Sequence, residues 1–459
     1  MSKFIEKKIH LYVIADYCTA LLTWFCFFVF RKHFIETNPY SFREIFQSER
    51  LYIGLLFVPV FWILFYYLAN SYNNLLKKSR LLEIYKTIAH TFFGSILLFF
   101  TLMLDDIIKA YSDYYQLFFV FFGMQCLFTI FGRYMVLQYI KNQLIAGNLS
   151  IPTLLIGTVA TCKQIEQELH ASTVKLPYNI VQKIEVTNDV KNIENYNIQT
   201  EHYSDVILAL PNQLGISIDA WIVYFLNKEK SVQLLPDELD VLSGKFKTQS
   251  VFGTQLIEIP TALMTPWEKH SKRCVDIFLS FCGLIFLLPF FAFIAYKIKR
   301  TTKGSIFFRQ ERIGLNGKTF SIIKFRSMIE NAEDGNPMLS SENDPRITSF
   351  GKVMRKYRID ELPQLWNVLK GDMSLVGPRP ERAYYIQKII QIAPQYQLLH
   401  RVPPGITSLG MVKFGYASNI AEMLQRMRYD LLYIENISVL MDIKILLYTV
   451  ITLWKGKGK

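Results

Sequence analysis

Cysteine is scarce in this chain, and none of its six cysteines forms a CxxC pair. Most of them lie in apolar runs, where cysteine behaves as a small hydrophobic residue. The sequence therefore predicts neither a disulfide framework nor a zinc site. A small-residue cleavage site is also missing after the first apolar run, so we expect that run to be retained as a membrane anchor rather than removed as a signal peptide.

Acidic residues are outnumbered, because 38 Asp and Glu stand against 51 Lys and Arg, which gives a net charge of +13. Such a charge suits nucleic acid, anionic lipid or phosphorylated substrates. Hydrophobic residues make up 51% and aromatic residues 15% of the chain. This composition favours membrane association over nucleic-acid binding, and the basic residues match no recognised nucleic-acid-binding module. A length of 459 residues predicts two or three domains.

Residues 1–145 contain four apolar stretches, each close to the ~20 residues needed to cross a bilayer. They cover residues 11–30, 51–70, 89–104 and 115–136. Tyrosine and tryptophan cluster near their ends, as at membrane interfaces. A buried bundle in a soluble domain is the alternative, but aromatic-rich apolar runs of this length rarely repeat in soluble proteins. We therefore predict a transmembrane helical region of about four spans.

Residues 146–262 have a composition typical of soluble domains. Buried strands are expected at 151–158, 204–211 and 231–236, and a helix at 162–171. Alternating strands and helices predict a small parallel α/β sheet of the Rossmann-like kind. The turn after Gly157 lacks the further glycines with which a dinucleotide site lets the backbone approach a pyrophosphate. A structural or regulatory role, rather than nucleotide binding, is therefore expected for this domain.

Residues 273–296 form a fifth apolar run, interrupted by Asp276 and Pro289. Basic residues lie on both sides of it, namely Lys269, Lys272 and Arg273 before it and Lys297, Lys299 and Arg300 after it. Positive charge on both flanks predicts that both ends stay in the cytoplasm. Proline kinks a helix, so we expect a re-entrant helix that enters one leaflet and returns, with a full crossing as the alternative.

Asp360 and Glu361 are adjacent carboxylates, preceded by Arg355, Lys356 and Arg358. Neighbouring carboxylates raise each other's pKa unless cations or a metal compensate. An acidic pair in a basic field suits a site that holds a divalent metal and meets a phosphate, since magnesium favours carboxylates together with substrate phosphates. A helix cap paired with nearby arginines is the plainer alternative.

The sequence from about residue 272 to the C-terminus resembles the bacterial sugar transferases, also called monotopic phosphoglycosyl transferases. Five blocks occur in the family's order: 308–314 (FRQERIG), 324–328 (KFRSM), 344–348 (DPRIT), 360–364 (DELPQ) and 371–380 (GDMSLVGPRP). The resemblance implies a catalytic domain over 263–459 that is mostly α-helical, associates with the membrane and contains the re-entrant helix. It also implies transfer of a sugar-1-phosphate from a UDP-sugar to polyprenyl phosphate, with release of UMP.

The resemblance also implies roles for individual residues. Asp360 would attack the β-phosphorus to form a covalent phosphosugar intermediate, and Glu361 would bind Mg²⁺; the residues alone leave the reverse assignment open. The expected substrate-binding residues are Arg312, Lys324, Arg326, Arg346, Arg355 and Arg379. Residues expected to shape the site are Pro289, Pro363, Pro378 and Pro380.

Two positions depart from the family pattern. Arg358 stands where a small polar residue is commoner, and Ser408-Leu409-Gly410-Met411 replaces a segment that usually reads Gly and then Ala-Gln. These departures bear on sugar choice and nucleotide contacts. A glycosyl transferase that releases UDP and a membrane scaffold with an inactive transferase-like domain are the alternative functions. The resemblance further implies a bacterial plasma-membrane location, a cytoplasmic catalytic domain, contact with membrane lipids and a homodimer.

Overall fold

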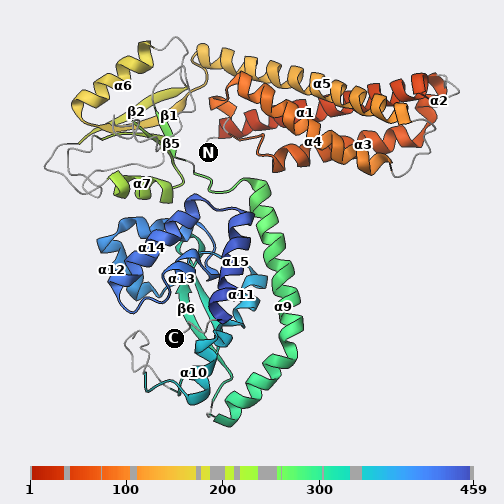
Figure 1. Cartoon of the computed structure of the whole chain (residues 1–459). Helices are drawn as coiled ribbons and strands as arrows, with labels where there is room; N and C mark the ends of the chain where they lie inside the picture. The colour runs from red at the N-terminus through yellow and green to blue at the C-terminus, as the bar shows by residue number, and fades with distance from the viewer. Residues whose placement is uncertain are drawn as a thin grey trace. The chain divides into compact units, whose positions relative to one another are not determined.

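The computed structural model describes residues 3–35, 42–73, 75–103, 111–171, 177–186, 202–210, 218–235, 256–259, 261–301, 304–330 and 344–454. The chain forms two compact units (Figure 1). Unit 1 consists of Met1–Ile216, Lys230–Ile259 and Thr265–Trp267. Unit 2 consists of Ser217–Glu229, Pro260–Met264 and Glu268–Lys459.

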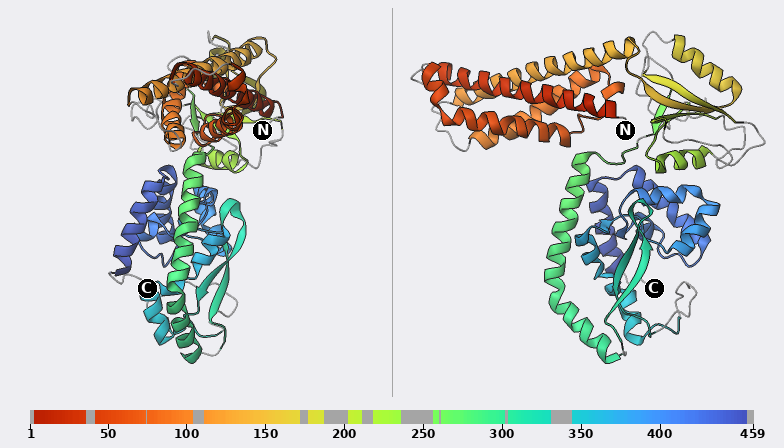
Figure 2. Two further views of the ribbon diagram at one scale, coloured as in Figure 1. Left: turned by 90° about the vertical axis from the view of Figure 1, so that its right-hand side faces the viewer. Right: turned by 180° about the vertical axis from the view of Figure 1, so that it is seen from behind.

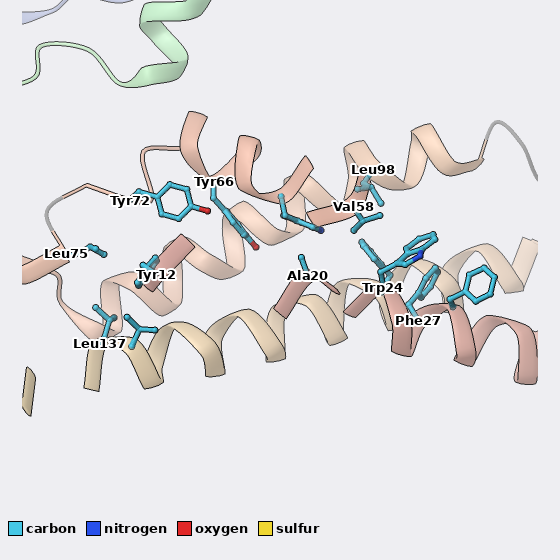
Figure 3. Packing of buried hydrophobic residues seen from close by; sticks show 14 of the residues in the cluster. Tyr12, Ala20, Trp24, Phe27, Val58, Tyr66, Tyr72, Leu75, Leu98 and Leu137 are labelled. Carbon is cyan, nitrogen blue, oxygen red and sulfur yellow. The ribbon is translucent and has the colours of Figure 1, made fainter. Parts of the chain in front are cut away.

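Long helices fill the first part of unit 1, at the four stretches predicted from apolar composition. They are α1 (Lys3–Phe30, continued by the π-helix η1, Arg31–Ile35), α3 (Glu49–Leu68), α4 (Arg80–Met103) and α5 (Tyr111–Ile145), with short α2 (Phe42–Gln47) and η2 (Leu75–Lys77) between them. Aromatic side chains such as Trp24 and Phe27 pack with Val58 and Leu98 in the bundle core (Figure 3). Five described helices, these four and α9 of unit 2, are long and apolar enough to cross a bilayer, which indicates a multi-pass membrane protein.

The interior of this bundle also holds a network of paired charges. Arg133 on α5 is 1% exposed and donates two hydrogen bonds to Asp16 on α1, at 2.9 and 2.8 Å. It also donates to Glu83 on α4 at 3.1 Å, and Lys78 lies 2.9 Å from the same carboxylate. The ring centroid of Tyr66 lies 4.2 Å from the guanidinium carbon of Arg133. These charged side chains therefore link α1, α4 and α5 through hydrogen bonds inside the bundle.

The rest of unit 1 is a five-stranded sheet in the order β2-β1-β3-β4-β5. Its strands are β1 (Ile151–Gly157), β2 (Tyr178–Glu185), β3 (Asp205–Ala209), β4 (Ser231–Leu234) and β5 (Ile257–Ile259), and α6 (Val159–Ala171) follows β1. The three predicted strands are present as β1, β3 and β4, although residues 211 and 236 lie outside the described ones. The sheet is parallel as predicted except for β5, which pairs antiparallel with β4.

Strand β1 ends at Gly157, next to the first turn of α6. Thr161 at the start of α6 donates a hydrogen bond to the carbonyl of Ala209 on β3 at 2.8 Å. A Cβ on Gly157 would lie 2.7 Å from the Thr161 hydroxyl and 2.9 Å from the Ala209 carbonyl oxygen. This glycine therefore serves close packing between strand and helix.

Unit 2 combines helices with short strands (Figure 2). Its elements are α7 (Ile218–Asn227), α9 (Pro266–Thr301), β6 (Phe307–Ile313), η5 (Leu315–Gly317), β7 (Thr319–Phe325), α10 (Ser349–Lys356), η6 (Ile359–Glu361), α11 (Gln364–Lys370), β8 (Ser374–Val376), α12 (Ala383–Ile392), η7 (Pro394–Arg401), β9 (Gly405–Thr407), α13 (Leu409–Lys413), α14 (Ile420–Glu435) and α15 (Val439–Trp454). Strands β6 and β7 form an antiparallel hairpin that the sequence patterns did not predict. Buried side chains of α11, α12 and α14, such as Val368, Ile389 and Tyr433, form the main core.

Helix α9 contains the predicted re-entrant segment and runs without interruption through Pro289. It is bowed along one side of unit 2 in Figures 1 and 2, as expected for a long helix that contains a proline. Lys272 and Asp276 are buried near its beginning, and Ile294 and Ile298 near its end. Both ends of α9 are therefore fixed to the same folded unit.

Candidate active site

Asp360 and Glu361 lie on the single turn of 3₁₀ helix η6, between α10 and α11. Both are buried, with 8% and 4% of their surface exposed. Arg358 enters this turn with φ 54° and ψ 26°, a left-handed conformation that costs a non-glycine residue energy and is held only by its surroundings. Pro363 leaves the turn with a helical φ of −62° and leads directly into α11. The backbone on both sides of the carboxylates is thus constrained.

Glu361 is fixed by two cations on one of its oxygens. Lys324 Nζ donates to Oε1 at 2.8 Å, and Arg379 Nη2 donates to the same oxygen at 3.0 Å. Burial opposes ionisation, but Arg379 and Lys324 outweigh it and hold the pKa of Glu361 well below its usual range. No hydrogen bond from the described residues reaches the other oxygen, Oε2.

Asp360 is in a different electrostatic state. Burial and the neighbouring Glu361 charge raise the pKa of Asp360, against the opposing effect of Lys324, Arg355 and Arg379. Within the described parts of the chain, its carboxylate accepts no hydrogen bond and forms no ion pair. The site therefore contains one carboxylate that is fixed and ionised beside one that has no partner among the described residues.

Lys324 reaches the site from strand β7. Its position in the hairpin is opposite Phe308 of β6. The side chain of Asn367 on α11 joins this strand to the site, because its Nδ2 donates to the Ser321 carbonyl at 2.8 Å and its Oδ1 accepts from the Ile323 amide at 3.1 Å. The hairpin and α11 therefore hold the lysine and the carboxylates at a fixed separation.

Arg379 is positioned by the strand before it. Strand β8 pairs in parallel with β9, and the Gly377 amide continues this pairing by donating to the Thr407 carbonyl at 3.0 Å. A Cβ on Gly377 would lie 2.3 Å from the Pro403 carbonyl oxygen, so only glycine permits this approach. Pro378 and Pro380 flank Arg379 and restrict its backbone further.

A set of buried polar contacts, which we call the β8 clamp, fixes β8 to three helices. Asp276 of α9 accepts from the Ser374 hydroxyl at 2.7 Å and from the Leu375 amide at 3.0 Å. Lys272, one turn earlier, donates to the Val376 carbonyl at 2.9 Å and to Asp442 of α15 at 2.5 Å. Tyr433 of α14 donates to Asp442 at 2.7 Å. The apolar helix α9 is thereby connected to the strand that carries Arg379.

The other predicted substrate-binding cations have protein partners. Arg312 lies 3.3 Å from Glu381, which also accepts from Arg426 at 2.6 Å. Arg346 pairs with Asp344 at 2.6 Å, and Arg355 donates to the Ser327 hydroxyl at 2.9 Å. Arg326 is buried just after β7. The structure therefore brings Lys324 and Arg379 directly onto Glu361, and the remaining predicted cations make other contacts.

Sequence reasoning missed several residues of this region. Asn367, Glu381 and Arg426 lie in the polar framework described above, and Tyr416 contacts Arg379, as does Met411 of the segment that departs from the family pattern. The Met411 sulfur lies 3.4 Å from Arg379 Nη1, and the Tyr416 ring centroid lies 5.4 Å from the guanidinium carbon. The one sequence signal for the β8 clamp was Asp276, a single carboxylate in an otherwise apolar run, which requires a buried partner.

The carboxylates fit a magnesium ion shared with a substrate better than an ion enclosed by protein. The described residues contain no group of three or more His, Cys, Asp or Glu side chains that could hold a metal. Magnesium needs only one or two carboxylates when phosphates and water complete its coordination. Asp360 and Oε2 of Glu361 supply such oxygens.

A cavity of about 1230 Å³ in unit 2 does not include these carboxylates. Its lining comes from several elements, among them Lys269, Arg273, Asn316, Met373 and His400. The charge cluster, and not cavity size, therefore identifies the candidate site.

The chain is similar to known bacterial sugar transferases. The family model for bacterial sugar transferase matches residues 267–456. The UDP-N-acetylgalactosamine-undecaprenyl-phosphate N-acetylgalactosaminephosphotransferase of Aeromonas hydrophila is 36% identical over 219 residues, 48% of this chain and 51% of that protein. The UDP-glucose:undecaprenyl-phosphate glucose-1-phosphate transferase of Klebsiella pneumoniae is 36% identical over 247 residues, 53% of either chain.

A shorter relative is matched almost completely. The exopolysaccharide production protein PSS of Rhizobium leguminosarum is 39% identical over 194 residues, which are 41% of this chain and 97% of that protein. The match thus covers about half the length of the first two relatives and nearly all of the third. The range matched by the family model, residues 267–456, contains Asp360, Glu361 and Arg379.

Proposed function

The chain belongs to the bacterial sugar transferase family, and on this premise we propose that it transfers a sugar-1-phosphate from a UDP-sugar to undecaprenyl phosphate. The product would be the first lipid-linked intermediate of an exopolysaccharide or related glycan. The observation that carries the proposal is the unequal pair of carboxylates, with Glu361 locked by Lys324 and Arg379 and Asp360 free. A carboxylate in that state is suited to attack phosphorus, as in aspartyl-phosphate enzymes.

In the first step, an Asp360 carboxylate oxygen attacks the β-phosphorus of the UDP-sugar. The bond between this phosphorus and the oxygen that bridges to the α-phosphate breaks, and UMP leaves with the electron pair. Lys324 and Arg379 stand beside the carboxylates and offset the negative charge of the diphosphate, since phosphoryl transfer depends mainly on positioning and charge stabilisation. The sugar phosphate remains on Asp360.

In the second step, a phosphate oxygen of undecaprenyl phosphate attacks the same phosphorus. The bond to Asp360 breaks, its carboxylate is regenerated, and the sugar is left on a lipid diphosphate. Glu361 Oε2 is the oxygen that we assign to magnesium, which when bound would neutralise phosphate charge and orient the diphosphate. The fixed charge of Glu361 suits this role, because its low pKa keeps it ionised throughout.

We further propose that α9 is a re-entrant helix. Asp276 and Ile294 are 18 residues apart by their numbers, which corresponds to about 27 Å of helix, close to the thickness of a bilayer core. A full crossing would place these two positions on opposite sides of the membrane, yet both pack against unit 2. The exposed apolar side chains of α9, Phe281 and Phe286 among them, would face lipid, together with Leu447 of α15 and Trp366 of α11.

The proposed organisation has three parts: membrane helices over 1–145, a non-catalytic Rossmann-like domain over 146–262 and the transferase domain over 263–459. The protein would reside in the bacterial plasma membrane with the transferase domain in the cytoplasm, where nucleotide sugars are found, and would act as a homodimer. Labelling of single cysteines placed at Lys269 and Lys299 tests the topology. Access for a membrane-impermeant reagent from the same side supports re-entry, and access from opposite sides contradicts it.

The activity is tested with purified protein in nanodiscs, undecaprenyl phosphate, magnesium and a panel of UDP-sugars. UMP release that requires Asp360, and is lost in Asp360→Asn, supports the proposal. UDP release would instead assign the protein to ordinary glycosyl transfer. Release of neither nucleotide from any donor, with folding intact, would favour a scaffold that has lost activity.

A further inference from the structure

Arg358 is a cation of the site that has no acidic partner in the part of the chain that the structure describes. No carboxylate of the described residues lies within ion-pair distance of its guanidinium. The guanidinium carbon lies 4.7 Å from the ring centroid of Tyr416, and Nη1 lies 3.8 Å from the sulfur of Met411. An aromatic face and a thioether hold a guanidinium in place without using most of its N–H donors.

The charges around the carboxylates leave a positive surplus. Lys324 and Arg379 are both committed to one oxygen of Glu361. Arg358 adds a further cation two residues before Asp360, and its charge acts on Glu361 as well. A half-buried guanidinium with most of its donors unused forms strong charge-assisted hydrogen bonds when an anion meets it. The described residues of the site therefore carry a net positive charge that an anionic ligand would offset.

Arg358 and Met411 share Arg379 as a neighbour. Nη1 of Arg379 lies 3.4 Å from the Met411 sulfur, and both guanidinium groups lie over the Tyr416 ring. These two positions are also the places where the sequence departs from the family pattern, with arginine for a small polar residue and methionine for glutamine. The two departures from the pattern are 53 positions apart in the chain, yet their side chains are in contact.

The exchange has a chemical consequence. A glutamine at 411 would offer an amide oxygen that could accept from Arg358, whereas a thioether sulfur is a weak acceptor. The left-handed backbone at Arg358 is a strained feature of the kind that concentrates at functional sites. Arginine with methionine therefore leaves guanidinium donors available beside the reactive carboxylate.

We propose that Arg358, held by Tyr416 and Met411, contacts the donor substrate and binds an anionic oxygen of it. That oxygen belongs either to the diphosphate or to a carboxylate on the sugar. This inference rests on the proposed function and adds a residue that sets which donors are used.

The test compares Arg358→Ser and Arg358→Lys with wild type, using neutral UDP-hexoses, UDP-N-acetylhexosamines and a UDP-hexuronic acid as donors. Loss of a hydrogen bond to a charged group predicts that Arg358→Ser raises KM about 10- to 100-fold, with partial recovery in Arg358→Lys. A rise for all donors assigns the anion to the diphosphate, and a rise for the hexuronic acid alone assigns it to the sugar. An unchanged KM for every donor overturns the inference. The exposed Arg428→Ser on α14 is the matched control.

Met411→Gln tests the pairing. We expect it to raise KM in the wild-type background, because the amide captures Arg358, and to have little effect in Arg358→Ser. Equal effects in both backgrounds would overturn the role of Met411.

Direct titration of UDP onto wild type and Arg358→Ser in the presence of magnesium keeps the inference separate from the proposed function. If wild type releases no UMP, weaker UDP binding by the variant still supports a diphosphate contact, and equal binding contradicts it.

Discussion

Two clusters of buried charge, one inside the helix bundle of unit 1 and one around Asp360 in unit 2, are built from the same residue types. In the bundle, Arg133 and Lys78 stand against Asp16 and Glu83, and every charge has an opposite partner. Around Asp360 the cations outnumber the carboxylates, and one carboxylate has no partner among the described residues. Complete pairing suits a structural role, and incomplete pairing leaves groups available for a substrate.

The largest expected effect is on catalysis and comes from Arg379. Arg379→Ala should lower kcat by about 100- to 1000-fold, since it removes a fixed charge from the site where negative charge is transferred. Arg379→Lys should recover only part of this loss, because lysine cannot reproduce the guanidinium geometry. Steady-state UMP release measures both variants. A kcat within twofold of wild type for Arg379→Ala would remove this arginine from the mechanism.

The bundle should respond in stability. Arg133→Met leaves Asp16 and Glu83 buried without their shared partner, which typically costs about 3–5 kcal/mol. Thermal unfolding in detergent should show a much lower midpoint. Replacing the whole network, with Asp16→Leu, Glu83→Gln and Lys78→Met added, should restore most of the loss. A single Arg133→Met variant as stable as wild type would contradict a structural role for the pairing.

A smaller effect on activity is expected from the β8 clamp. Asp276→Asn keeps the side-chain shape but weakens its two hydrogen bonds to β8, which should displace Arg379 and lower kcat roughly 10-fold with little change in KM. The exposed Asp219→Asn on α7 is the matched control. If Asp276→Asn acts only on thermal stability and leaves kcat unchanged, the clamp holds the fold and does not position the site.

The smallest effect concerns pH and Asp430 on α14. Burial raises the pKa of Asp430 to about 6, although its carboxylate accepts the Gly410 amide at 2.9 Å. Because the folded pKa lies above the unfolded value, protonation stabilises the fold below about pH 4, and this contribution is lost as the pH rises through about 6. Unfolding midpoints of wild type should fall over that range relative to Asp430→Asn. Parallel curves for the two proteins would contradict the raised pKa.

Sequence patterns predicted the features whose signals are local. Apolar runs predicted the helices α1, α3, α4 and α5, and continuous apolar segments predicted the buried strands β1, β3 and β4. Strand β2 was missed because it alternates exposed and half-buried residues, and β6 because it is rich in polar residues. Both strands are stabilised by pairing with a neighbouring strand, and a local sequence pattern contains no information about that partner.

The candidate site was also predictable only in part. Adjacent Asp360 and Glu361 and the motif blocks around them were visible in the sequence. The contacts that separate their roles were not, because Lys324 lies 37 residues and Arg379 18 residues from Glu361. The clamp residues Lys272 and Asp442 are 170 residues apart. Such pairings depend on how α9, α14 and α15 pack around β8, so only the structure distinguishes a locked carboxylate from a free one.

The most direct test of this difference is intact-protein mass spectrometry after rapid mixing with the active UDP-sugar and magnesium, without undecaprenyl phosphate. Wild type should gain the mass of one phosphosugar and release an equal amount of UMP. Asp360→Asn should gain nothing, whereas Glu361→Gln should keep the attachment residue and form the adduct slowly. An adduct that persists in Asp360→Asn, or UMP release that begins only when undecaprenyl phosphate is added, would contradict Asp360 as the free, reactive carboxylate.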